Sequence, residues 1–134
     1  MRRPVNSLLR ILVVASIAVL VLDTFGSLAS KAFGFPYSSL AWGSLIIYAA
    51  TGFFAARGGG LQTAALGGGA VALVDTTLGW AISWALGPGR PLAGYTGMGP
   101  IAGTIALAWL TGIASGLVGG LIARFLTRRP DVPG

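Results

Sequence analysis

Two aspartates within long apolar stretches are the residues of this chain best suited to chemistry. Asp23 is followed by Thr24, and Asp75 by Thr76, in the matching phrases Val-Leu-Asp-Thr and Leu-Val-Asp-Thr. A carboxylate inside a membrane costs ~2.5–3.5 kcal/mol on insertion scales, so each aspartate should face other helices rather than lipid. These four residues are predicted to form a site that binds a cation or exchanges a proton.

The same aspartates also have a structural interpretation. Each carboxyl would then be buried and hydrogen-bonded to Thr24, Thr76, Tyr48 or a serine of a neighbouring helix. Such polar contacts commonly hold membrane helices together, at about 0.6 kcal/mol per bond. The sequence leaves both interpretations open.

Most other kinds of site are excluded by residues that the chain lacks. It contains no Cys, no His and no Glu. Without them no disulfide, no His or Cys metal site and no nucleophile–base pair is expected, so the sequence predicts no enzyme, no metal site and no cofactor. The net charge of +6 comes from bases at the ends of the apolar stretches rather than on one basic face, so nucleic-acid binding is not expected.

The composition is typical of a membrane protein. Hydrophobic residues make up 54% of the 134 residues and charged residues 9%, whereas soluble domains have about 25% charged residues. Apolar stretches at 11–30, 40–56, 61–86 and 101–126 are each long enough for a helix that crosses a bilayer. The fold class is therefore predicted to be all-α integral membrane, with four transmembrane helices and the lipid bilayer as main partner.

A cleaved signal peptide is the competing interpretation of the first stretch. Arg2, Arg3 and Arg10 would form its basic region, and residues 27–29 (Ser-Leu-Ala) resemble a cleavage site of small residues.

An internal repeat favours retention of the first helix. One constant shift of the sequence places Asp23 on Asp75, and a second shift places the second apolar stretch on the fourth. The matches follow the same order in both halves. Residues 11–57 and 58–126 are therefore predicted to be two parallel copies of a transmembrane helical hairpin.

Four spans would place both termini on the same side of the membrane. Residues 1–10 would form a cytoplasmic N-terminus, and residues 127–134 a disordered cytoplasmic tail. That side would hold all the bases except Lys31 and Arg90. Because basic residues concentrate on the cytoplasmic side, the predicted topology is N-in/C-in.

Aromatic residues gather near the ends of the apolar stretches. Tyr37, Trp42, Trp80 and Trp84 are predicted to lie at the outer membrane surface, where aromatic rings are enriched. Trp109 falls in the middle of a span and is predicted to pack at a helix or subunit interface.

Small residues recur at helical spacing and would let helix backbones approach closely. The glycines predicted to pack helix against helix are Gly43, Gly52, Gly68, Gly79, Gly103, Gly112, Gly116 and Gly120. The favoured function is a structural or accessory membrane subunit, which packs through these small-residue seams as a homo-oligomer or in a larger membrane complex. The alternative is an oligomeric small transporter or channel for a cation or proton that uses Asp23 and Asp75.

One segment carries a family resemblance. Residues 51–57, Thr-Gly-Phe-Phe-Ala-Ala-Arg, precede a glycine-rich turn and a second glycine-rich span. This arrangement resembles small four-span bacterial membrane proteins of unknown function, over roughly the second and third spans. In those proteins a further cation and often a histidine are expected in the turn, whereas here the turn is Gly58-Gly59-Gly60. The resemblance implies a bacterial inner membrane protein and supplies no activity or site residue.

Overall fold

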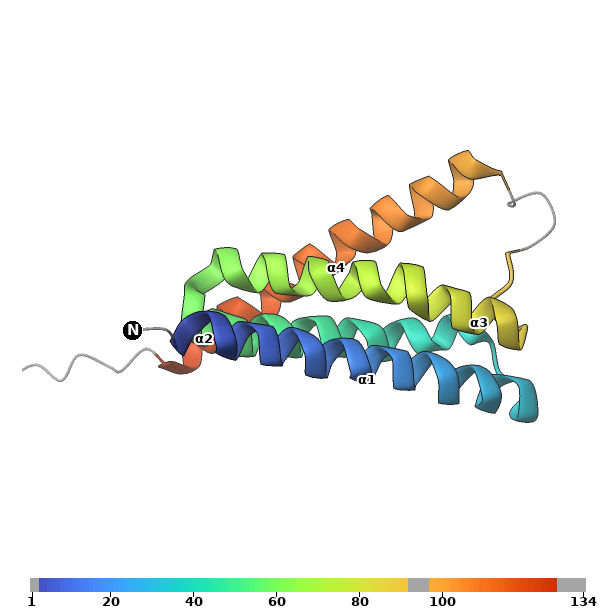
Figure 1. Cartoon of the computed structure of the whole chain (residues 1–134), viewed down its shortest axis with the longest axis horizontal. Coiled ribbons are helices and arrows are strands. Elements are labelled where there is room, and N and C mark those ends of the chain that lie inside the picture. The colour runs from blue at the N-terminus through green and yellow to red at the C-terminus, as the bar shows by residue number, and fades with distance from the viewer. Residues whose placement is uncertain (1–2, 92–96, 128–134) are drawn as a thin grey trace, which may run out of the picture.

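The computed structural model describes residues 3–91 and 97–127, with side chains from Asn6 onward, and this part of the chain forms helices and no strand (Figure 1). The predicted disordered tail therefore lies outside the described residues, apart from Thr127. The helical elements are α1 (Arg3–Phe33), the 3-10 turn η1 (Tyr37–Leu40), α2 (Ala41–Val74), the π-helical turn η2 (Asp75–Gly79), α3 (Trp80–Leu86) and α4 (Met98–Thr127).

Helix α2 folds back on itself at Gly60. This glycine has φ 78° and ψ −170°, whereas the residues on both sides are helical. The chain reverses there (Figure 1), so that a first limb (41–59) runs antiparallel to a second limb (61–86), which continues through η2 and α3. The limbs touch closely, because a Cβ atom on Gly67 would lie 3.4 Å from Thr51 Cγ2.

Gly60→Ala should destabilise the fold, because the backbone conformation of Gly60 is one that essentially only glycine adopts, at a cost of about 1–3 kcal/mol for other residues. Gly58→Ala is the matched control, since Gly58 lies in helix and a Cβ there would meet open space. Alanine at 58 should be neutral or slightly stabilising. Thermal unfolding of the purified variants in detergent, followed by circular dichroism, measures both. Equal stability of the two variants would contradict the reversal at Gly60.

Three helices of the structure are long and apolar enough to cross a membrane. They span Asn6–Phe33, Tyr37–Leu86 and Met98–Thr127, with 28, 50 and 30 residues. At 1.5 Å per residue the shortest measures about 42 Å, whereas the hydrocarbon core of a bilayer is about 30 Å thick.

The surface of the protein is apolar, and many of its buried side chains are small or polar. Large hydrophobic side chains such as Val14, Phe25 and Phe125 are exposed. A soluble monomer rarely exposes so much apolar surface, so this arrangement fits lipid better than water. The buried polar side chains are Asp23, Ser27, Ser30, Ser44, Thr51, Asp75, Thr76 and Ser83.

Glycines hold the second half of α4 against both limbs of α2. A Cβ atom on Gly116 would lie 3.1 Å from Gly68 Cα, and a Cβ on Gly52 would overlap the backbone of Gly116. Gly112 faces Gly68, and Gly120 faces a small residue of the second limb. These glycines therefore make their close contacts with other helices of the same chain.

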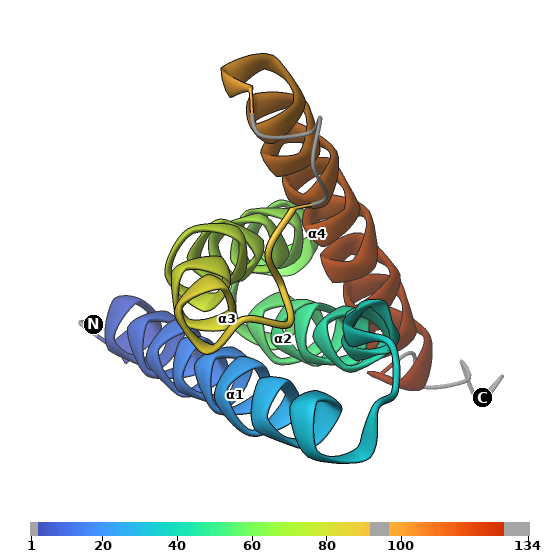
Figure 2. The ribbon, with the colours of Figure 1, turned by 90° about the vertical axis from the view of Figure 1, so that its right-hand side faces the viewer.

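The first half of α4 diverges from the other helices (Figure 2). Gly103 lies on this half, is exposed, and has no other group within 4 Å of its Cβ position. The prediction that Gly103 packs helix against helix is therefore wrong for the chain by itself. Gly103 lies nine residues before Gly112, which is two and a half helical turns, so the two glycines are on opposite faces of α4. The sequence does not show that α4 crosses the bundle obliquely.

Helix α1 packs along both the first limb (41–59) and the second limb (61–86). A Cβ atom on Gly43 would lie 2.8 Å from a methyl carbon of Leu22, so this glycine lets α1 and the first limb approach. Ser7 of α1 and Gly59 line the same pocket, and Gly120 of α4 lies against Leu61. The beginning of α1 and the end of α4 therefore lie at the same end of the bundle as the Gly60 reversal (Figure 1).

Candidate functional site

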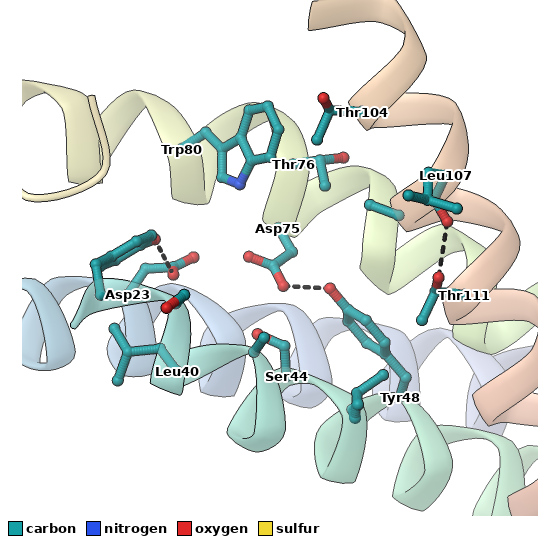
Figure 3. Close-up of a pocket in the computed structure, with 15 residues that line it drawn as sticks. Asp23, Leu40, Ser44, Tyr48, Asp75, Thr76, Trp80, Thr104, Leu107 and Thr111 are labelled. Atoms are coloured by element: carbon teal, nitrogen blue, oxygen red, sulfur yellow. Dashed lines mark hydrogen bonds between the residues drawn. The ribbon is translucent and has the colours of Figure 1, made fainter. Parts of the chain in front are cut away.

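Asp23 and Asp75 meet in the interior of the bundle. Asp23 comes from α1 and is 2% exposed, while Asp75 begins η2 and is 5% exposed. A Cβ atom on Gly79 would lie 3.0 Å from Asp23 Cγ and 3.0 Å from Asp75 Oδ1. The two carboxyl groups therefore face one another across this glycine (Figure 3).

A tyrosine caps each carboxyl. Tyr37, from η1, donates its hydroxyl hydrogen to Asp23 Oδ1 at 2.9 Å. Tyr48, buried on the first limb, donates to Asp75 Oδ2. The sequence predicted Tyr48 as a partner. Each phenol satisfies one oxygen of its carboxyl and leaves the other oxygen to face the opposite aspartate.

The pair has no basic side chain to neutralise it among the described residues. Asp23 Oδ2 is buried and finds no hydrogen-bond partner there. Each described basic side chain is exposed and lies near the end of a helix or in a connection, namely Arg10, Lys31, Arg57, Arg90 and Arg124. Two buried carboxylates that face one another repel, so the pair requires a proton or a bound cation.

The two predicted threonines keep their hydroxyl groups on their own helices. Thr24 donates to the Leu20 carbonyl at 2.7 Å, and Thr76 donates to the Ala72 carbonyl at 2.8 Å. Neither hydroxyl therefore reaches an aspartate as a donor. Thr76 nevertheless lines a cavity beside the carboxyl pair.

A cavity of about 300 Å³ adjoins the carboxyl pair. The first limb, the second limb and α4 all contribute to its wall, and it lies where α4 diverges from the bundle (Figure 3). Its polar and aromatic lining residues are Asp23, Tyr37, Ser38, Ser44, Tyr48, Asp75, Thr76, Trp80, Thr104 and Thr111, and the others are aliphatic.

No family model, curated protein or solved structure matches this chain.

Two residues of the site were predicted as part of the aromatic belt. Tyr37 binds Asp23 and lines the cavity, and Trp80 lines the same cavity while stacking on Trp84 with 6.0 Å between ring centroids. For Tyr37 the sequence did contain a signal. Tyr37 follows Pro36, where the chain turns back toward the first helix, and a buried tyrosine hydroxyl usually has a hydrogen-bond partner.

Trp80 was missed for a different reason. In a regular helix the residue five positions after Asp75 points elsewhere, because 3.6 residues complete a turn. In η2 the amide of Trp80 instead donates to the carbonyl of Asp75, which closes the wider π-helical turn. With this turn, Asp75 and Trp80 line the same cavity. Regular helical spacing therefore does not predict that Trp80 belongs to the site.

Proposed function

We propose that this chain is a four-span protein of the bacterial inner membrane with both termini in the cytoplasm. The reversal at Gly60 supports four crossings, because it divides the 50-residue segment Tyr37–Leu86 into two antiparallel limbs. Arg57 and Arg124 lie at the Gly60 end of the bundle, whereas Lys31 lies at the other end. This distribution follows the tendency of basic residues to remain on the cytoplasmic side.

We further propose that the protein is a small transporter in which a cation and a proton compete for the Asp23–Asp75 pair. One observation carries this proposal: two buried carboxyl groups face one another beside a cavity, with no basic partner among the described residues. Ionisable groups inside membrane segments commonly mark ion pathways and proton relays. Binding of a cation would release the proton that otherwise neutralises the pair, and the reverse exchange would release the cation.

The packing of the glycines also favours this function over an accessory subunit. Gly112, Gly116 and Gly120 are buried against the second limb of the same chain. These seams are therefore not available to a partner protein. Helix α1 supplies Asp23 to the site, so the proposed function also requires that the first helix is retained rather than cleaved as a signal peptide.

A structural or accessory role is the second candidate, and one observation favours it. The first half of α4 projects from the bundle and exposes Gly103, where a second copy or another membrane helix could approach closely (Figure 2). A homo-oligomer formed there would be compatible with transport as well.

The transport proposal is tested with purified protein in liposomes that contain a pH-sensitive dye. Inward gradients of Na⁺, K⁺ or a small organic ammonium ion are applied one at a time, and proton release is recorded. The wild-type protein should couple at least one cation to proton movement. In the double variant Asp23→Asn/Asp75→Asn this flux should be at least ten-fold lower, because the variant removes both carboxylates and keeps the shape of the side chains.

Asp131→Asn is the matched control, since it makes the same chemical change outside the described residues and should leave the flux unchanged. Circular dichroism and size-exclusion chromatography establish that the double variant is folded. Wild-type flux in a folded double variant would refute the transport proposal.

A further inference from the structure

We propose that the cation bound by the Asp23–Asp75 pair is a small organic ammonium ion with an apolar body, rather than a dehydrated metal ion. This inference rests on the proposed transport function and names its substrate class. Three features of the site carry it: the size of the cavity, the small number of carboxylate ligands, and the aliphatic and aromatic parts of the wall.

The cavity is too large for a bare inorganic cation. Its volume is about 300 Å³, whereas a water molecule takes up about 30 Å³ in the liquid. Pockets for organic ligands begin at about 300 Å³. The space beside the carboxyl pair therefore corresponds to a small organic molecule.

The site is also poor in carboxylate ligands. A hard cation such as Ca²⁺ takes 6–8 oxygen ligands, and the described residues contain no group of three acidic, His or Cys side chains. One oxygen of each aspartate already accepts a hydrogen bond from Tyr37 or Tyr48. The remaining carboxyl oxygens can neutralise one positive charge but cannot by themselves replace the hydration shell of a hard cation.

The wall of the cavity fits an apolar body beside a charged head. Leu40, Leu45 and Leu107 offer aliphatic surface, and Trp80 lies above the two carboxyl groups (Figure 3). Aromatic rings attract organic cations in addition to offering apolar contact. An ammonium group placed at the unpartnered Asp23 Oδ2 would leave the rest of the ligand against this wall.

The cavity reaches the surface on the side where α4 diverges. Thr104 and Leu107 line it and are also exposed. This face of α4 carries exposed hydrophobic side chains such as Leu110 and would contact lipid. A hydrophobic ammonium ion dissolved in the bilayer would therefore approach the carboxyl pair from the side, between α4 and the second limb.

The test uses radiolabelled benzyltrimethylammonium as probe and the full chain in nanodiscs, with empty nanodiscs subtracted. Saturable binding to the wild-type protein is expected. Asp23→Asn/Asp75→Asn should weaken it at least ten-fold. Neopentylbenzene, which has the same shape without the charge, should compete at least ten-fold less well than the unlabelled cation, because the carboxyl pair selects for charge.

A second pair of variants tests the cavity without touching the carboxyl groups. Ala108 lines the cavity, so Ala108→Phe should fill it and weaken probe binding at least ten-fold. Ala106, on the same helix, is exposed and does not line the cavity, so Ala106→Phe should bind as the wild type does.

The outcomes separate this inference from the transport proposal. Probe binding that is lost in both the aspartate variant and Ala108→Phe supports the organic ammonium ion. Absence of saturable probe binding, or binding that Ala108→Phe leaves unchanged, together with proton flux driven by Na⁺ or K⁺ through the aspartates, overturns the inference and leaves transport standing. Absence of any aspartate-dependent binding or flux overturns both.

Discussion

Gly116→Leu should lower the stability of the protein by more than about 3 kcal/mol, or prevent its folding. Its Cβ would lie 3.1 Å from Gly68 Cα, while the backbone of Gly116 itself occupies the Cβ position of Gly52. The atoms around Gly116 are mostly backbone and cannot rotate away as a flexible side chain can. Overpacking a core commonly costs 1–3 kcal/mol even where side chains can adjust. A leucine here would force α4 away from both limbs of α2.

Gly103→Leu is the matched control for this prediction. It makes the same substitution in the same helix, at a position with no other group within 4 Å. Replacing glycine within a helix should even stabilise it slightly. Thermal unfolding in detergent and the retention volume on size exclusion would measure both variants. If Gly116→Leu were as stable as Gly103→Leu, the packing of α4 described above would be incorrect.

The sequence predicted the position of a residue well where that residue type is tolerated in only a few structural environments. Asp23 and Asp75 lie within apolar stretches, and a carboxylate is tolerated there only among other helices. The structure indeed buries both. The close approach of α4 was similarly predictable, because Gly112 and Gly116 have no side chain to keep another backbone away.

Features that depend on the relative placement of helices were not predictable in the same way. The π-helical turn at Asp75–Gly79 lies between Asp75 and Trp80, which line the same cavity. Its hydrogen bonding departs from the regular pattern without a proline in the sequence. The first half of α4 diverges from the bundle and leaves Gly103 without a neighbour, whereas Gly112 and Gly116 in the second half lie against another helix. Both properties emerge only from the packed arrangement.

The proposed internal repeat also has a limit at the site. Both tyrosines that cap the aspartates come from residues 11–57, because Tyr37 precedes the first limb and Tyr48 lies within it. At the positions that the repeat would place on Tyr37 and Tyr48, the second half has Gly89 and Ala108. Ala108 therefore leaves room in the cavity where a second tyrosine would otherwise stand.

Gly79→Ala should disrupt the carboxyl pair while most of the bundle remains folded. The alanine Cβ would overlap Asp23 Oδ2 and lie 3.0 Å from Asp75 Oδ1. Asp23 would have to turn away, which also breaks its hydrogen bond from Tyr37. We expect a loss of stability of about 1–3 kcal/mol, as for other overpacked sites, and at least ten-fold weaker aspartate-dependent cation binding.

A double-mutant cycle would identify the overlap as the cause. Asp23→Ala removes the carboxyl that the new methyl group would strike, so Gly79→Ala added to Asp23→Ala should cost less than about 0.5 kcal/mol. Such strong coupling is expected only for residues in direct contact. Gly103→Ala should have the same small effect in both backgrounds, because nothing surrounds it. If Gly79→Ala were equally destabilising with and without Asp23, the glycine would be required for the shape of η2 rather than to make room for the carboxyl pair.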